Sequence, residues 1–175
     1  MPIKTLIIYA SVDGQTAKIC QFIQEILVQN NHTVDIFQID NSLPNLAKYD
    51  KILIASSIRY GVHNKQIEQL IQENYAVLNA KKSAFLSVNL VARKAEKNQP
   101  ETNPYASRFL KKILWKPTLS VVFAGRLNYK QYDILDRFLI QLIMRITKGP
   151  TDTSVDIEYT NWEDVKKFGE KFILL

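Results

Sequence analysis

The chain has 175 residues, of which 46% are apolar and 23% charged, which is typical of one globular domain and unlike a disordered chain. A single cysteine, Cys20, excludes an intrachain disulfide, and its place among apolar residues at helical spacing predicts a buried thiol. His32 and His63 stand apart from any Cys, His or Asp cluster, so we expect no metal site. No apolar run approaches the ~20 residues that cross a bilayer, and the first residues have no signal-peptide pattern.

Strand and helix patterns alternate along the chain. Apolar runs predict strands at 4–9, 33–38, 51–56, 83–88 and 120–124, and helical spacing predicts helices at 15–30, 65–78 and 104–114 and after Asn161. Asn103 followed by Pro104 is a helix cap followed by the favoured first residue. Five strands that alternate with helices indicate a doubly wound α/β fold with a parallel sheet, which we expect to form a single domain over residues 1–175.

The loop between the first strand and the first helix is a candidate anion site. It reads Ser11, Val12, Asp13, Gly14, Gln15 and Thr16. A helix N-terminus after a strand presents unpaired N–H groups and the positive end of the helix dipole, and the hydroxyls add donors. The loop lacks the glycine and lysine patterns of dinucleotide and nucleoside triphosphate sites, so it favours a monophosphate. The alternative is a simple capped turn.

Two further loops should open onto the same crevice, because ligands of such sheets bind beyond the carboxyl ends of the strands. One supplies an aromatic face at Tyr60, and the other supplies backbone groups for a polar ring edge. Together with the phosphate loop they describe a site for flavin mononucleotide (FMN). The expected lining is Ser57, Ile58, Arg59, Tyr60 and Gly61 after the third strand, and Ser87, Val88, Asn89, Leu90, Val91, Ala92 and Arg93 after the fourth.

Residues 126–155 do not fit the alternation of strands and helices. Within them, Ile134–Ile146 predicts a helix that is apolar except for a narrow stripe of Arg137, Gln141 and Arg145. One interpretation is a helix packed on the sheet or in a dimer interface, which leaves a homo-oligomer open. The other is a lid or membrane-surface helix, with Arg137 and Arg145 near lipid headgroups and Phe138, Leu139, Leu142 and Ile143 toward apolar material.

Charge is concentrated in one third of the chain. Residues 89–148 carry twelve Lys and Arg against four Asp and Glu, a net charge of +8, whereas the rest carries −2. Such a block predicts an anionic partner. No recognition motif or basic ribbon with interleaved aromatic residues supports nucleic acid.

The sequence resembles the flavodoxin superfamily over nearly its whole length, and within it the HemG-type protoporphyrinogen IX dehydrogenases, which pass electrons to membrane quinones. The stretches that carry this resemblance are 13–16, 55–61, 83–94, 136–144, 151–153 and 159–162. The resemblance implies a five-stranded sheet in the order 2-1-3-4-5 with a helical insertion at 126–155 after or within strand five. It also implies FMN as cofactor and FMN-dependent oxidation of protoporphyrinogen IX in haem biosynthesis.

The resemblance suggests partners for the remaining features. A menaquinone or ubiquinone acceptor implies peripheral attachment to the anionic cytoplasmic face of the bacterial inner membrane. The apolar substrate carries two propionates, for which Arg59, Arg93 and Lys94 are candidate contacts. We expect Asp13, which occupies a phosphate loop, to point its carboxylate away from the phosphate and order the turn.

No acid–base pair is evident in the sequence. The flavin can carry the redox chemistry, so no catalytic residue is assigned, and Tyr60 and His63 are only side chains to test. Two other functions stay open. One is a flavin-dependent NAD(P)H:quinone reductase, and the other is an electron carrier, which the positive segment disfavours.

Overall fold

The computed structural model describes residues 2–39 and 42–175. Its centre is a parallel sheet in the order β2-β1-β3-β5-β6, which confirms the expected order 2-1-3-4-5 of the five principal strands. The strands are β1 (Ile3–Ala10), β2 (His32–Gln38), β3 (Lys51–Arg59), β5 (Lys82–Val88) and β6 (Leu119–Phe123).

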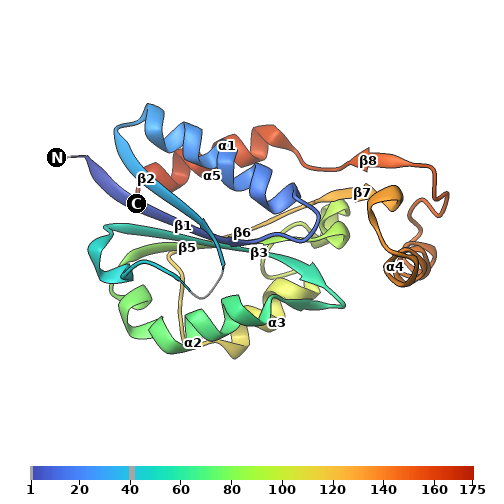
Figure 1. Cartoon of the computed structure of the whole chain (residues 1–175), viewed down its shortest axis with the longest axis horizontal. Coiled ribbons are helices and arrows are strands. Elements are labelled where there is room, and N and C mark those ends of the chain that lie inside the picture. The colour runs from blue at the N-terminus through green and yellow to red at the C-terminus, as the bar shows by residue number, and fades with distance from the viewer. Residues whose placement is uncertain (1, 40–41) are drawn as a thin grey trace.

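Helices cover both faces of this sheet (Figure 1). Helices α1 (Gln15–Gln29) and α5 (Trp162–Ile173) lie on one face, and α2 (Lys65–Asn79) and α3 (Pro104–Lys112) lie on the other. Successive residues of a strand point to opposite faces, so Ile7 packs in the core beneath α1 and α5 whereas Leu6 and Ile8 pack in the core beneath α2. Burial of each such side chain contributes about 1.5–3 kcal/mol.

Capping residues set where most helices begin. Asn64, Asn103, Asp133 and Asn161 each accept hydrogen bonds from backbone N–H groups of the first turn of the helix that follows. Such caps are worth about 1 kcal/mol each. The caps predicted at Asn103 and Asn161 are confirmed.

Two predicted element ends differ from the structure by two residues or more. Helix α3 ends at Lys112 rather than Leu114 because the chain is already extended at Ile113 and carries Trp115 into the core, where its Nε1 donates to Ser83 Oγ at 2.9 Å. Strand β3 continues to Arg59, past the predicted end at Ser56, because it pairs with a short antiparallel strand, β4 (Val62–His63).

The insertion, expected at 126–155, forms a unit at one end of the sheet that extends to Glu158 (Figure 1). Strands β7 (Arg126–Asn128) and β8 (Asp156–Glu158) pair antiparallel at its base, and α4 (Ile134–Ile146) is the predicted helix. Leu127, Tyr129, Tyr132 and Met144 pack together inside the unit. A short 3₁₀ helix, η4 (Tyr129–Gln131), also lies in the insertion, and others elsewhere are η1 (Leu46–Lys48), η2 (Leu90–Arg93) and η3 (Ala95–Lys97).

None of the helices in residues 2–39 and 42–175 combines the length and apolar character needed to cross a bilayer.

Two reactive side chains belong to the core. Cys20 is fully buried, as predicted, and burial raises the pKa of its thiol. His63 is 5% exposed, lies against Phe85 and Phe109 at ring-centroid distances of 5.3 and 4.4 Å, and its Nε2 contacts Ser87 Oγ at 2.9 Å. Burial lowers the pKa of His63 to about 4.

The depressed pKa of His63 predicts a loss of stability in mild acid. Between about pH 6.5 and 4 the unfolded chain binds a proton that the folded protein does not, so the free energy of unfolding falls as the pH falls, by about 3 kcal/mol at most. We expect His63→Gln to remove most of this slope in urea titrations between pH 4.5 and 7.

The protein with His63 and the His63→Gln variant should both carry His32→Gln, because burial also lowers the pKa of His32. If the free energy of unfolding varies with pH in the same way after His63→Gln, His63 is not the group responsible.

Candidate functional site

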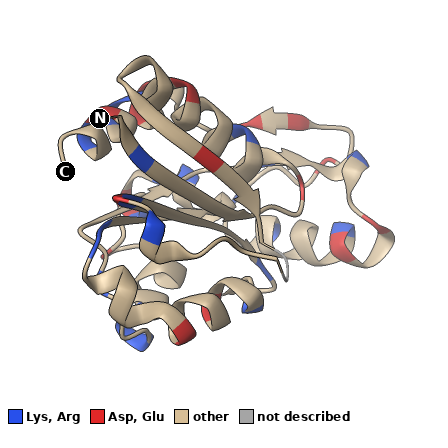
Figure 2. Ribbon diagram, turned by 60° about the vertical axis from the view of Figure 1, so that its left-hand side comes forward, with Lys and Arg blue, Asp and Glu red and all other residues tan. Residues whose placement is uncertain are grey.

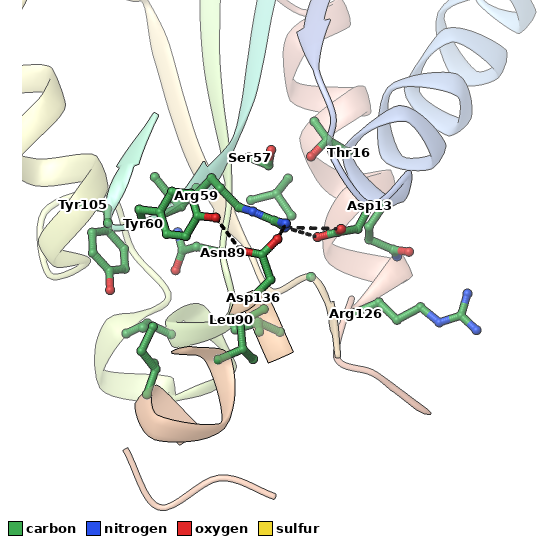
Figure 3. A pocket seen from close by; sticks show the side chains of 18 of the residues that line it. Asp13, Thr16, Ser57, Arg59, Tyr60, Asn89, Leu90, Tyr105, Arg126 and Asp136 are labelled. Carbon is green, nitrogen blue, oxygen red and sulfur yellow. Dashed lines mark hydrogen bonds and ion pairs between the residues drawn. The ribbon is translucent and has the colours of Figure 1, made fainter. Parts of the chain in front are cut away.

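A pocket lies where the carboxyl ends of β1, β3 and β5 meet the insertion (Figure 3). Four segments form its walls: the loop before α1, the β3–β4 turn, the segment after β5, and the insertion. Its lining comprises Ser11, Asp13, Gln15, Thr16, Ser57, Ile58, Arg59, Tyr60, Gly61, Val88, Asn89, Leu90, Val91, Tyr105, Gly125, Arg126, Tyr132, Asp136, Leu139, Ile140 and Ile143. Three loops that the sequence predicted to share a crevice therefore do so.

The first wall is the N-terminus of α1. Gly14 precedes the helix with φ of 83°, a conformation that L side chains rarely adopt, and a Cβ placed there would meet no atom within 4 Å. Helix α1 has no side-chain cap, unlike α2, α3, α4 and α5. Thr16 is buried here, and Ser11 Oγ accepts only a long 3.4 Å hydrogen bond from Ala17 N. These donors and the helix dipole favour an anion.

Gln15 lines the same wall but is held by the protein. Its Nε2 donates to Glu158 Oε1 at 2.8 Å and to Thr160 Oγ1 at 2.9 Å. This side chain therefore fixes the first turn of α1 against the base of the insertion.

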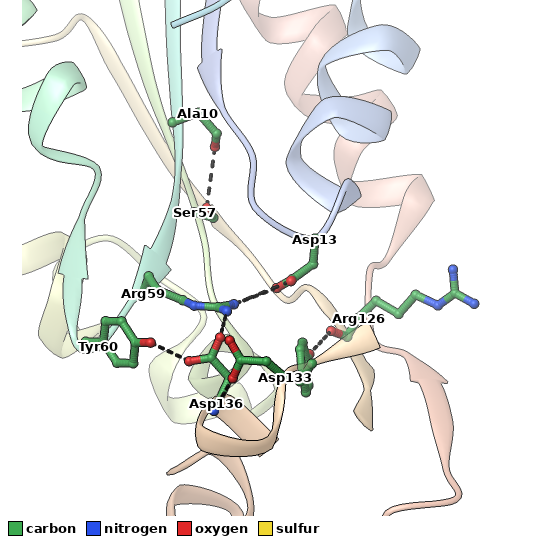
Figure 4. Close-up of polar contacts among 9 residues, drawn as sticks. Ala10, Asp13, Ser57, Arg59, Tyr60, Arg126, Asp133 and Asp136 are labelled. Atoms are coloured by element: carbon green, nitrogen blue, oxygen red, sulfur yellow. Dashed lines mark hydrogen bonds and ion pairs between the residues drawn. The ribbon is translucent and has the colours of Figure 1, made fainter. Parts of the chain in front are cut away.

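The second wall is the tight turn between β3 and β4. Tyr60 and Gly61 connect Arg59 to its pairing partner Val62, and both have positive φ, 51° and 78°, as a type I′ turn requires. Tyr60 is 64% exposed, so most of its ring is open to a ligand. Ser57, two residues before Arg59 in β3, donates to Ala10 O at 3.4 Å and joins this wall to β1 (Figure 4).

The third wall follows β5. Val88, Asn89, Leu90 and Val91 line the pocket. The Asn89 side chain accepts from Ala92 N at 3.1 Å and from Asn103 Nδ2 at 3.0 Å, which fixes the loop against α3.

The fourth wall comes from the insertion. Leu139, Ile140 and Ile143 of α4 present apolar side chains to the pocket. Asp136, whose side chain is 4% exposed, accepts a hydrogen bond from Arg59 Nη2 and one of 2.5 Å from Tyr60 Oη.

Arg59 also reaches the first wall. Its Nη1 lies 3.4 Å from both carboxylate oxygens of Asp13, so one guanidinium contacts two carboxylates from different elements (Figures 3 and 4). Burial raises the pKa of Asp13, and the charge and hydrogen bond of Arg59 oppose part of that rise. Burial, with the nearby Asp13 charge, also raises the pKa of Tyr132.

Several residues expected at the site have other contacts. Ser87 contacts His63 in the core, and Ala92 packs with Ala106 and Val122. Arg93 donates to Leu90 O at 2.8 Å and to Thr147 Oγ1 at 2.9 Å, so it is engaged at the end of α4 outside the lining. Val12, Gly14 and Lys94 also lie outside the lining.

The polar stripe of α4 faces the insertion itself. Arg137 Nε donates to Tyr129 O at 3.1 Å and Gln141 Nε2 to Thr151 O at 2.7 Å, whereas Arg145 is exposed. Phe138 and Leu142, which were predicted to face apolar material, are 63% and 45% exposed.

Several residues of the lining carry no signal in the sequence that was used to predict the site. Asp136 is one of them. It is the single acid in the apolar run Ile134–Ile146, and a carboxylate in such a position usually has a buried partner. The others are Tyr105, Gly125, Arg126, Tyr132 and Ile140. They come from distant segments, and no local pattern brings them together.

Comparisons with known proteins agree with this architecture. Residues 6–154 match the flavodoxin domain family. The chain is 40% identical to the protoporphyrinogen IX dehydrogenase [quinone] of Escherichia coli K12 over 169 residues. The aligned residues cover 96% of this chain and 93% of that protein. A protein of the same name from Leishmania major is 40% identical over 174 residues, which cover 98% of this chain and 75% of that protein.

Solved flavodoxins share the fold at low sequence identity. The Megasphaera elsdenii flavodoxin has a TM-score of 0.58 at 12% identity, with 98% of this chain and 99% of that chain covered. A flavodoxin from the domain Archaea has a TM-score of 0.57 at 16% identity, with 98% and 97% covered. The chain therefore belongs to the flavodoxin family and, within it, to the family of quinone-linked protoporphyrinogen IX dehydrogenases.

Proposed function

We propose that this protein is an FMN enzyme that oxidises protoporphyrinogen IX to protoporphyrin IX and passes the electrons to a respiratory quinone. The observation that carries the proposal is the pocket itself. It combines a flavodoxin-type anion loop with an apolar wall from the insertion, in a chain 40% identical to dehydrogenases of that name.

The pocket residues fit FMN. The uncapped N-terminus of α1, with Ser11 and Thr16, would hold the phosphate, since its N–H groups and hydroxyls are donors that favour an anion. Tyr60 and the segment Asn89–Val91 would flank the ring system. Bound FMN supplies the capacity to accept and return electrons, while the protein positions the reactants.

Arg59 is the cation best placed to orient a carboxylate substrate. It lines the pocket, and its planar guanidinium suits paired contacts with carboxylates. Leu139, Ile140 and Ile143 give an apolar surface in the same pocket, which matches a macrocycle whose charge is confined to two propionates. Arg93 and Lys94 lie outside the lining, so any contact with substrate would be at the rim.

The outer face of α4 suits an anionic membrane surface. Its most exposed apolar residues are Ile134, Leu135, Phe138, Leu142 and Ile146. Charged positions cover only a small part of this helix (Figure 2), and Arg145 and Lys148 lie near its C-terminal end. An apolar face with flanking cations is the pattern of an interfacial helix. Attachment at the cytoplasmic face of the inner membrane would bring a lipid-soluble quinone to the pocket.

Not all of the basic segment contributes to this face. Arg108, Lys111 and Lys112 belong to α3, which covers the sheet, and Lys112 pairs with Glu68 of α2. The cations relevant to a membrane are therefore those of the insertion.

The activity is tested by porphyrin fluorescence. Purified FMN-loaded protein, incubated anaerobically with protoporphyrinogen IX, detergent and a menaquinone analogue, should produce protoporphyrin emission that requires both enzyme and quinone. Emission no faster than the enzyme-free control, with FMN bound, would contradict the proposal. Rapid bleaching of the flavin by NAD(P)H would instead favour a quinone reductase.

The phosphate assignment predicts a selective loss of affinity. Thr16→Ala should weaken FMN binding about tenfold to a hundredfold, because it removes a hydrogen bond to a charged group. Riboflavin, which lacks the phosphate, is the matched ligand, and its affinity should change little. Equal losses for both flavins in fluorescence titrations would show that Thr16 acts through folding alone.

The membrane assignment predicts that a charge on α4 releases the protein from lipid. Phe138→Asp should reduce co-sedimentation with anionic vesicles at least severalfold, because a carboxylate would enter the interface. Leu114→Asp is the matched control, since Leu114 is 65% exposed like Phe138 but follows α3, outside the insertion. Equal effects of both substitutions would contradict a role for α4.

A further inference from the structure

The contact between Asp136 and the β3–β4 turn spans the pocket. Asp136 lies in the first turn of α4, whereas Arg59 and Tyr60 lie at the carboxyl end of β3 and in the turn that follows it, 77 and 76 residues earlier. The carboxylate is almost fully enclosed and accepts from both side chains (Figure 4). Charge-assisted hydrogen bonds shielded from water are stronger than neutral ones, so this contact holds one end of α4 against the sheet.

The opposite end of α4 is held differently. Arg93 donates to both the carbonyl and the hydroxyl of Thr147, the residue that ends the helix. Beside it, a Cβ at Gly149 would lie 2.5 Å from Met144 Sδ and 2.7 Å from Arg93 Nη2, so this end is closely packed. Between the ends, Arg137 and Gln141 bind only backbone of the insertion among the contacts described.

These attachments leave α4 fixed at its C-terminal end and held at its N-terminal end by one cluster of charged and hydroxyl groups. The cavity beneath it is about 130 Å³. Sites for small molecules are typically about 300–1,000 Å³, so a flavin ring together with a second large ring needs α4 to move outward.

We propose that Asp136 is a latch that holds α4 across the pocket, and that a carboxylate of the substrate opens the pocket by replacing Asp136 at Arg59. The second half of this inference rests on the proposed function. It makes Asp136 a positioning residue that acts through Arg59 and Tyr60.

The exchange is balanced in charge. Arg59 exchanges one carboxylate for another, and Asp136 regains water when α4 moves outward, so neither charge is left buried without a partner. Tyr60 Oη, released from Asp136, becomes a free donor at the pocket. An esterified substrate offers no anion, so it cannot displace Asp136 in this way.

The latch is tested by hydrogen exchange of the 134–146 segment in FMN-loaded protein. Asp136→Asn should raise its exchange rate about tenfold, because a neutral amide replaces a charge-assisted acceptor. The matched control is Asp133→Asn. It removes the same charge from the same turn but keeps a capping side chain, and it should leave the rate near wild type. Equal rates in the two variants would overturn the latch.

The carboxylate exchange is tested with protoporphyrin IX and its dimethyl ester. The diacid should raise exchange in α4 of the wild type, whereas the ester should not. Asp136→Asn should bind both porphyrins severalfold more tightly, because opening the pocket no longer breaks a charged contact, whereas only in the diacid complex does a ligand carboxylate replace Asp136 at Arg59. A diacid that leaves exchange in α4 of the wild type unchanged, or an ester that raises it equally at equal occupancy, would overturn the exchange.

A wild type that binds neither porphyrin would overturn the carboxylate exchange together with the proposed substrate. The comparison of Asp136→Asn with Asp133→Asn uses no porphyrin, so it still decides the latch.

Discussion

The contact of Arg59 with two carboxylates joins the parts of this molecule that make the site. Asp13 belongs to the loop before α1, Arg59 to the end of β3, and Asp136 to the insertion. A guanidinium can serve two acids because its donors diverge in a plane. Without it, Asp13 and Asp136 would lie near the pocket as two negative charges without a cation between them, beside a loop suited to a phosphate.

The parallel sheet explains why this contact lies where it does. Because β1, β3 and β5 run in the same direction, their carboxyl ends open three loops at one edge. The core beneath α1 and α5 and the core beneath α2 fix those strands, so the loops start from rigid positions. The insertion contributes the apolar fourth wall, and Leu127, Tyr129, Tyr132 and Met144 form its small core, against which Leu90 of the segment after β5 also packs.

Local sequence patterns were enough to predict the fold and the three loops of the site. Apolar periodicity located all five principal strands, and Asn103 and Asn161 marked helix starts, because both signals depend on neighbours in the chain. The three pocket loops followed from the rule for parallel sheets. The contact of Asp136 with Arg59 could not be predicted, because it joins positions 77 residues apart through an insertion whose orientation no periodicity fixes. For the same reason, Arg137 was expected near lipid headgroups but donates to the backbone of the insertion at Tyr129 O.

One pocket, between the carboxyl ends of the parallel strands and α4, is expected to hold the flavin. A crystal structure of the protein with FMN bound tests this expectation most directly. We expect the phosphate at the first turn of α1 beside Ser11 and Thr16, and the ring between Tyr60 and the segment Asn89–Val91, with its edge in contact with the inner face of α4. A flavin ring bound away from α4, with the insertion making no contact to it, would contradict the account.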